Sequence, residues 1–299
     1  SATKEGVVFD PFAGSCTTLL SARENGLDSF GIEVMPIGKF ILNSKLILEK
    51  YNLDSLSNKI KEMKKIDFGE YPTDQKNSFK HIRITEKAFP KDTERKLNGF
   101  LNYIFKLENV ELRQILSFAC FSILEKISYT RKDGQYLRWD HRAEKGKTKF
   151  DKGEILSFEK ALFKQLSQIL TDLRNMKLFN VETKRNSQIP LQSGSCLEIL
   201  PEINNESFSL VISSPPYCNR YDYTRTYALE LAYLGIDERG IRDLRQKLLS
   251  ATVENKDKIS YLKEIYKKKN RESDFKKAEE IFNKNKALHE VLEILQEHK

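Results

Sequence analysis

The stretch VVFDPFAGSCTTLLSARENGLDSFGIEV, residues 7–34, decides the fold because it places two short apolar runs on either side of a helical segment. Val7 to Phe9 and Phe30 to Val34 are predicted to be buried parallel strands. The residues between them suit a helix that stops at Gly26. A strand, a crossover helix and a second strand belong to an open α/β sheet, which binds ligands at the carboxyl ends of its strands.

The same α/β pattern returns late in the chain, after a long interruption. A helix is predicted from Pro36 to about Tyr51. Residues 189–203 are predicted to form a third strand, a turn and a short helix, and residues 210–213 a further strand. Between that helix and these later segments, residues 110–127 and 156–176 have helical spacing. We therefore predict an α/β core from residues 1–51 and 181–235, a large, mostly helical insertion at 52–180, and a charged helical C-terminal segment at 236–299.

The composition favours a polyanionic partner and a reducing compartment. Lys and Arg number 51 and Asp and Glu 43, which gives a net charge of +8. The four cysteines are far apart, so we expect no disulfides and a cytoplasmic location, and the four scattered histidines predict no metal site. The longest apolar run, at 115–124, is too short to cross a bilayer, so we expect no membrane partner.

A cationic stretch that also carries aromatic residues joins the two helices of the insertion. It reads SYTRKDGQYLRWDHRAEKGKTKFDKG, residues 128–153. Arginines interleaved with tyrosine and tryptophan suit phosphate contacts and base stacking, whereas an ordinary solvated loop would explain the charge alone. The candidate nucleic-acid contacts here are Arg131, Lys132, Tyr136, Arg138, Trp139 and Arg142.

Two acidic residues and a glycine together predict a binding site for a ligand that contains a nucleoside. Asp10 lies just beyond the first strand, and Gly14 lies in the turn before the helix, where the backbone can approach a ligand closely. Glu33 ends the second strand, the position at which a carboxylate can accept both ribose hydroxyls of an adenosine-type cofactor. The Gly-Lys-Ser/Thr ending of a phosphate-binding loop is missing.

The last predicted strand stops at two prolines, in the sequence SSPPY at residues 213–217. Pro215 and Pro216 end sheet pairing and hold a rigid loop at the carboxyl edge of the sheet. Such a loop can accept hydrogen bonds from an exocyclic amine through Ser214 Oγ and the Pro215 carbonyl, while Tyr217 offers a planar face to an unstacked base. The alternative is a proline turn followed by a core tyrosine.

The segments DPFAGSCTT, GIEVMP and SPPY resemble motifs I, II and IV of the amino-methyltransferases of DNA, which use S-adenosylmethionine to methylate adenine or cytosine amines. The resemblance covers residues 5–40 and 189–235, and YTRKDGQYLRWDHR (129–142) is also similar to relatives of this group. It implies a Rossmann-like methyltransferase core. The family usually has glycine where this chain has Cys16, and about three more strands after SPPY, so the sheet here is expected to be incomplete.

The resemblance also implies roles for individual residues. Glu33 would bind the ribose of the cofactor, and Ser195 stands where the family often has an acidic residue beside the cofactor. The methionine end of the cofactor would be lined by Asp10, Pro11, Phe12, Ala13 and Gly14, and the flipped base would be held by Ser214, Pro215, Pro216 and Tyr217. Arg220 and Arg225 follow this loop and are expected to lie near DNA.

The function implied is transfer of a methyl group from S-adenosylmethionine to the exocyclic amine of a flipped base in double-stranded DNA, as in restriction-modification. Serine at the first position of SPPY leans slightly toward N4-cytosine. Two alternatives stay open. One is an N6-adenine or RNA amino-methyltransferase. The other is a non-catalytic half that binds DNA and cofactor and needs a second polypeptide to complete the sheet.

Overall fold

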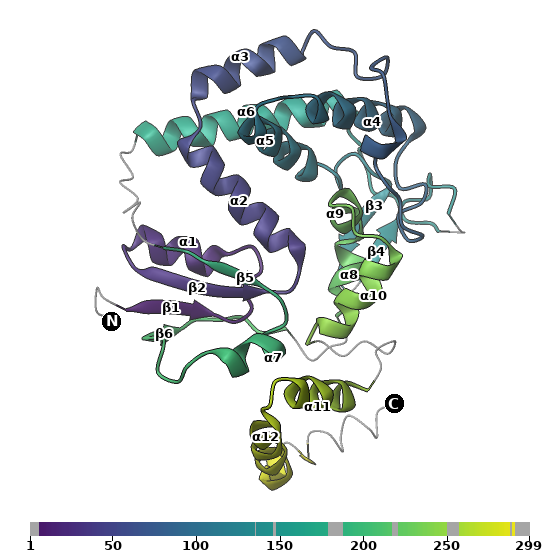
Figure 1. Cartoon of the computed structure of the whole chain (residues 1–299). Coiled ribbons are helices and arrows are strands. Elements are labelled where there is room, and N and C mark those ends of the chain that lie inside the picture. Colours follow the sequence, from purple (N-terminus) through teal and green to yellow (C-terminus); the bar gives the residue numbers. More distant parts are fainter. Residues whose placement is uncertain are drawn as a thin grey trace.

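A computed structural model describes residues 6–134, 136–145, 148–178, 188–216, 221–249, 257–287 and 289–290. Figure 1 shows a small parallel sheet below a helical body, with two further helices at the C-terminal end of the chain. Helix α2 (Pro36–Lys50) leads from the sheet into the helical body. None of the described helices is long and apolar enough to span a membrane.

The sheet confirms the predicted α/β class. Its four strands run parallel in the order β5-β2-β1-β6, where β1 is Val7–Asp10, β2 is Asp28–Glu33, β5 is Leu191–Ser193 and β6 is Leu210–Val211. Helix α1 (Thr17–Glu24) connects β1 to β2. Gly26, in the left-handed conformation at φ 73°, follows α1, as expected for a glycine stop. The last strand is shorter than predicted, because pairing with β1 ends at Val211.

The insertion contributes most of the hydrophobic core. Its elements are α3 (Leu53–Met63), η1 (Gln75–Asn77), α4 (Lys91–Phe105), α5 (Val110–Phe121), the antiparallel pair β3 (Thr130–Asp133) and β4 (Tyr136–Trp139), and α6 (Phe158–Leu178). The two predicted helices are thus present. The residues between them form a hairpin that turns at Gly134, which adopts a left-handed φ of 56°.

Residues 221–249, which follow the SSPPY stretch, pack into the same core as the insertion. They form α8 (Tyr223–Thr226), α9 (Ala228–Tyr233) and α10 (Glu238–Lys247), and Leu231 and Ile241 are buried in the cluster that contains α5 and α6. The Tyr233 hydroxyl lies 3.0 Å from Ser117 Oγ of α5. Helices α8 to α10 are therefore anchored in the helical body.

The short helices α7 (Cys196–Ile199) and η2 (Leu200–Glu202) follow β5, and the C-terminal helices α11 (Lys258–Lys268) and α12 (Glu272–Lys284) lie beyond them (Figure 1). Two hydrogen bonds join this region to Glu198 of α7: the Tyr261 hydroxyl donates to Glu198 Oε1 at 2.7 Å, and Lys269 Nζ, directly after α11, donates to the Glu198 carbonyl at 2.6 Å. Ile259 of α11 and Ile281 of α12 are exposed.

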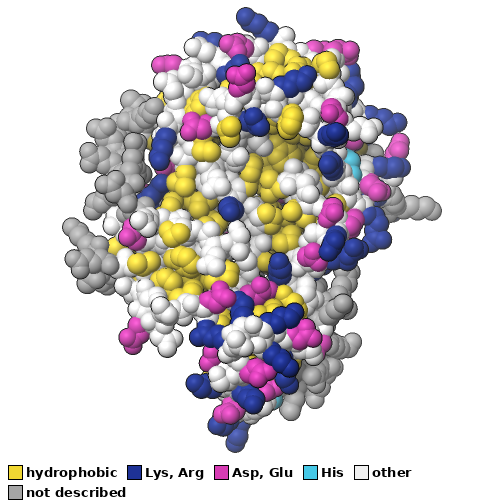
Figure 2. Space-filling view, in the orientation of Figure 1, with side chains coloured by type: hydrophobic (Ala, Val, Ile, Leu, Met, Phe, Trp, Pro, Cys, Tyr) yellow, Lys and Arg dark blue, Asp and Glu magenta, His cyan; other side chains and the backbone are white. Residues whose placement is uncertain are grey.

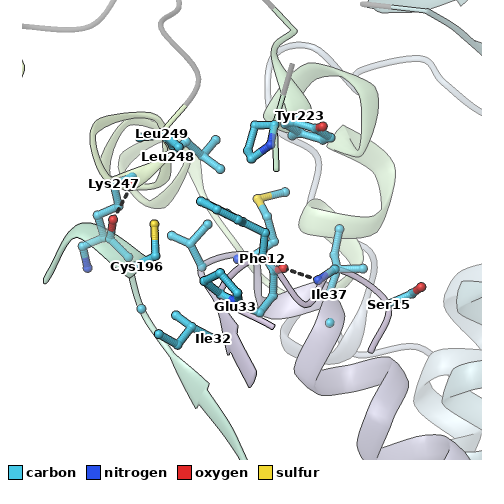
Figure 3. Close-up of a pocket in the computed structure, with 18 of the residues that line it drawn as sticks. Phe12, Ser15, Ile32, Glu33, Ile37, Cys196, Tyr223, Lys247, Leu248 and Leu249 are labelled. Atoms are coloured by element: carbon cyan, nitrogen blue, oxygen red, sulfur yellow. Dashed lines mark hydrogen bonds between the residues drawn. The ribbon is translucent and has the colours of Figure 1, made fainter. Parts of the chain in front are cut away.

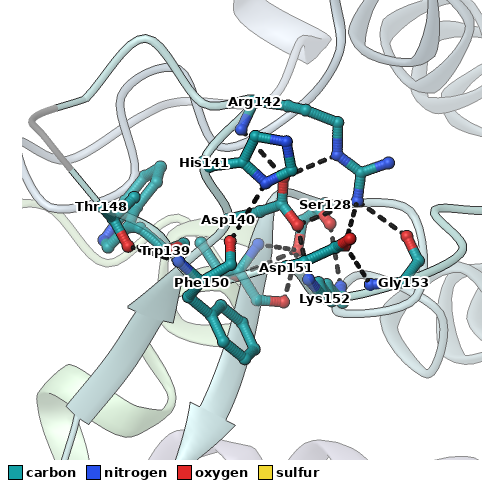
Figure 4. Close-up of polar contacts among 11 residues, drawn as sticks. Ser128, Trp139, Asp140, His141, Arg142, Thr148, Phe150, Asp151, Lys152 and Gly153 are labelled. Atoms are coloured by element: carbon teal, nitrogen blue, oxygen red, sulfur yellow. Dashed lines mark hydrogen bonds and ion pairs between the residues drawn. The ribbon is translucent and has the colours of Figure 1, made fainter.

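A buried carboxylate organises the loop that follows the hairpin (Figure 4). Asp140 is inaccessible to solvent and accepts hydrogen bonds from Arg142 Nε at 2.6 Å, Arg142 Nη2 at 2.8 Å and the Lys152 amide at 2.6 Å. The Arg142 guanidinium holds the pKa of Asp140 well below its usual range. Lys152 Nζ donates to the carbonyls of Ser128, at 2.8 Å, and Glu125, and burial lowers the pKa of Lys152 to about 8. These bonds join the loop to residues 125–128, which follow α5.

Replacing this carboxylate should destabilise the fold. Asp140→Asn should lower the free energy of unfolding by about 2 kcal/mol at pH 7, because Arg142 and the Lys152 amide lose a charged acceptor. Asp133→Asn is the matched control, since its pair with Arg138 is half exposed, and it should cost no more than about 0.5 kcal/mol. Urea unfolding measures both values, and equal effects of the two substitutions would contradict the structural role given to Asp140.

The difference in free energy of unfolding between wild type and Asp140→Asn should depend on pH. The folded-state pKa of Asp140 is depressed, so its contribution to stability is complete above the unfolded pKa of about 4 and is lost as the pH falls toward the folded value. The gap between wild type and Asp140→Asn should therefore narrow below about pH 4.

Candidate cofactor and base site

A cavity of about 280 Å³ opens at the carboxyl ends of the strands (Figure 3). Every strand of the sheet supplies part of its wall: Phe12 follows β1, Glu33 ends β2, Ser195 follows β5, and Ser214 and Pro216 follow β6. The two stretches singled out in the sequence, more than 180 residues apart, thus face one cavity. This is the position at which parallel α/β sheets bind ligands.

Glu33 joins the two turns that border the cavity. Its Oε2 accepts a hydrogen bond from the Gly14 amide at 2.6 Å, and its Oε1 accepts one from the Met35 amide at 2.7 Å. Burial raises the pKa of Glu33, and these amide hydrogen bonds oppose the rise. A carboxylate has about four acceptor sites, so Glu33 retains acceptor capacity for a ligand. Glu33 can therefore shape the cavity and still accept ligand hydroxyls.

Close backbone approach explains the glycines around Glu33. A Cβ at Gly38 would lie 2.3 Å from the Gly14 carbonyl oxygen, so only glycine lets α2 begin this near the first turn. Gly14 itself has a φ of 52°, in the left-handed region that favours glycine.

Cys16 adopts a left-handed backbone conformation, which favours glycine. Its φ is 64° and its ψ is 27°, which costs energy for a residue with a side chain. The thiol is fully buried, lies 3.8 Å from the Gly38 carbonyl oxygen, and has its pKa raised by burial to about 12. Packing of a small, neutral side chain offsets the backbone strain.

Asp10 supports the cavity from behind rather than lining it. It is buried, and its Oδ1 accepts hydrogen bonds from the Phe12 amide at 3.0 Å and from Ser213 Oγ at 2.8 Å. Ser213 directly precedes Ser214, so Asp10 connects the first turn to the start of the predicted base-holding loop. Ala13 is likewise buried in the turn, whereas Pro11 lines the cavity.

The predicted base-holding loop is only partly described. Ser214 and Pro216 line the cavity, and Pro215 lies between them, whereas Tyr217 and Arg220 fall outside the described residues. Two aromatic residues that the sequence interpretation did not assign, Tyr223 and Tyr227, also line the cavity. Their signal in the sequence was the repetition of tyrosines directly after SPPY.

The wall beside β5 contains residues from the C-terminal segment. Ser195 is buried, and its Oγ donates a hydrogen bond to the Lys247 carbonyl at 2.8 Å. Lys247, Leu248 and Leu249 line the cavity, although residues 236–299 were predicted to form a separate segment. The sequence indicates their role only weakly, because Leu248 and Leu249 are simply two apolar residues directly after a strongly charged helix.

Most of the candidate nucleic-acid contacts have partners within the chain. Lys132 Nζ lies 2.5 Å from Glu230 Oε1 and 4.3 Å from the Tyr227 ring centroid, so it joins the hairpin to α9. Arg142 is held by Asp140, as described above. Arg131 is exposed, and none of the ion pairs among the described residues uses it.

The remaining cations and aromatics of the hairpin lie on or near its surface. Arg138 pairs with Asp133 at 2.9 Å and stacks on the Phe150 ring at 4.4 Å, and Lys145 Nζ lies 4.5 Å from the Trp139 ring centroid. Tyr136 is part of β4, but its side chain is outside the described part of the chain. In the helix after SPPY, Arg225 pairs with Asp222 at 3.2 Å. Figure 2 shows Lys and Arg gathered on the hairpin side of the molecule.

Among the residues that the structure describes, one group of side chains has the spacing of metal ligands: Asp140, His141 and Asp151. The Asp140 oxygens already accept hydrogen bonds from Arg142 and Lys152. The group therefore gives no reason to assign a metal site.

Curated relatives of the chain are methyltransferases. It is 41% identical to the Type II methyltransferase M.BsoBI of Geobacillus stearothermophilus over 97% of its own length and 59% of that protein. It is 48% identical to the Type II methyltransferases M.AvaI of Nostoc sp. (strain PCC 7120 / SAG 25.82 / UTEX 2576) and Anabaena variabilis, over 84% of this chain and 52% of theirs. No family model and no solved structure matches the chain. These identities show that the chain is a homologue of the type II methyltransferases and spans about half of their length.

Proposed function

We propose that the chain transfers a methyl group from S-adenosylmethionine to the exocyclic amine of a flipped base in double-stranded DNA. The serine that begins SPPY slightly favours N4 of cytosine as the target over N6 of adenine or an RNA amine. The observation that carries the proposal is the common cavity of Glu33 and the Ser214–Pro216 loop. A nucleoside-binding carboxylate and an amine-accepting loop on one cavity are what direct methyl transfer needs. A DNA substrate is compatible with the net charge of +8 and with a cytoplasmic location.

The residues of the cavity fit such a cofactor. The remaining acceptor capacity of Glu33 suits ribose hydroxyls, and Phe12 and Ile37 add apolar surface to the cavity. Pro11, Phe12 and Gly14 lie at the end of β1, between Glu33 and Ser214, and suit the methionine portion. The bound cofactor would supply an electrophilic methyl group on a sulfonium.

The chain's own contribution is orientation of the amine. Ser214 Oγ and the Pro215 carbonyl would accept its N–H bonds and aim the nitrogen lone pair into the cavity, while Tyr217 would stack on the base. Held in this way, the amine nitrogen would face the electrophilic methyl group that the bound cofactor supplies, and the proton that the amine loses on transfer would pass to solvent. Proximity and alignment lower the barrier, so no enzyme nucleophile is required.

A second candidate function is a non-catalytic half of a larger enzyme, and the edge of the sheet favours it. Leu210, Val211 and Ile212 are 37%, 58% and 50% exposed, although parallel strands are usually covered on both faces. Hydrophobic side chains lie at the surface over the sheet in Figure 2. The relatives contain nearly as much polypeptide again. In this case, strands supplied by further polypeptide would pair with β6 and complete the sheet.

Methylation of DNA separates these functions. The purified chain is incubated with tritiated S-adenosylmethionine and mixed-sequence duplex DNA, and the DNA is digested to nucleosides. Label in N4-methylcytosine is expected. Label in N6-methyladenine, or label only in a parallel reaction that contains RNA in place of DNA, would show that the target is wrong. Binding of cofactor and DNA without any label would support the non-catalytic half, and no cofactor binding at all would refute both proposals.

The hairpin offers a test of DNA binding in which two adjacent cations should behave differently. Arg131→Ala should weaken binding to duplex DNA and reduce the slope of log affinity against log salt by about 1, because an exposed phosphate contact is lost. Lys132→Ala should instead lower thermal stability and leave the salt slope nearly unchanged, because Lys132 pairs with the buried Glu230. An unchanged slope for Arg131→Ala would mean that the hairpin is ordinary solvated surface.

A further inference from the structure

Two sets of hydrogen bonds and ion pairs hold the last turn of α10 between distant parts of the chain. On one side, the Lys247 carbonyl accepts the hydrogen bond from Ser195 Oγ at the end of β5. On the other, Arg245 Nε donates to Thr224 Oγ1 at 2.9 Å and lies 3.2 Å from Asp222 Oδ2. Asp222 and Thr224 are buried in the segment that follows the catalytic loop. The end of α10 therefore connects the β5 side of the cavity to that segment.

The strand order indicates which part of the cofactor the end of α10 would meet. The order β5-β2-β1-β6 places Glu33 on β2, with the base-holding loop on the β6 side and Ser195 on the β5 side. If Glu33 holds the ribose and the sulfonium faces β6, the adenine must extend toward β5. Residues 247–249 line the cavity there, and Figure 3 shows Leu248 and Leu249 on the Cys196 side of the cavity.

The side chains in this position suit an aromatic ring. Leu248 is buried at 5% exposure and anchors the wall in the helical core, whereas Leu249 lines the cavity with 39% of its surface still exposed. Leucine surface that remains exposed beside a cavity can be covered by a planar base, and its burial then favours binding.

We infer that the end of α10 is a clasp on the cofactor site, in which Leu249 packs against the adenine and Arg245 and Ser195 position the wall. This inference rests on the proposed function. The clasp makes adenine binding depend on a helix that is also joined to the segment after the catalytic loop. Cofactor binding should therefore stabilise α10 and α8 together.

Calorimetric titration with S-adenosylhomocysteine tests the contact. Leu249→Ala should bind this probe about fivefold to tenfold more weakly than wild type, because less apolar surface is covered. Leu200→Ala is the matched control: Leu200 is 40% exposed, close to the 39% of Leu249, and does not line the cavity. It should bind like wild type. Equal affinities of the two variants would overturn the clasp while leaving the proposed function intact, and failure of wild type to bind would overturn both.

Amide hydrogen exchange of the wild-type chain provides a second test that needs no variant. Saturating S-adenosylhomocysteine should slow exchange in residues 241–249 and 223–226 as well as at the turn after β1. Slower exchange at the turn alone, with α10 and α8 unchanged, would show that the probe binds without engaging the clasp.

Discussion

The Glu33 carboxylate is the constraint on which the site depends. It accepts hydrogen bonds from the amides of Gly14 and Met35, so a single side chain sets the separation of the two turns that follow β1 and β2. The close contact of Gly38 with the Gly14 carbonyl and the left-handed conformation of Cys16 are consequences of drawing these turns together. The same buried oxygens keep acceptor capacity for a ligand, which joins the architecture of the cavity to its chemistry.

The helical body supplies most of the hydrophobic core that supports this small sheet. Four strands, one of them two residues long, give little burial alone, and most large buried side chains belong to the insertion and to α8–α10. Lys132 and Glu230 join the hairpin to α9, and Ser195 and Lys247 join β5 to α10. The proposed base-holding loop is thus flanked by elements anchored in a core that lies outside the sheet, and among the described strands β6 pairs with β1 alone.

The sequence was sufficient for features that depend on local pattern, and insufficient for those that depend on distant partners. Apolar runs predicted β1 and β2, and helical spacing predicted α5 and α6. The hairpin at Asp133-Gly134 was taken for a loop although Asp-Gly is a turn signal. That Lys132 is paired could not be predicted, because its partner, Glu230, is 98 residues away and no pattern joins them. The place of Leu249 in the cavity depends in the same way on how α10 packs.

Binding of S-adenosylmethionine to a Glu33→Gln variant tests the central claim most directly. An amide in place of one carboxylate oxygen removes a charged acceptor, so affinity measured by calorimetry should fall at least about tenfold. Glu24→Gln, an exposed change at the end of α1, should bind like wild type. If Glu33→Gln binds the cofactor as tightly as Glu24→Gln, the cavity at the ends of β1 and β2 is not the cofactor site.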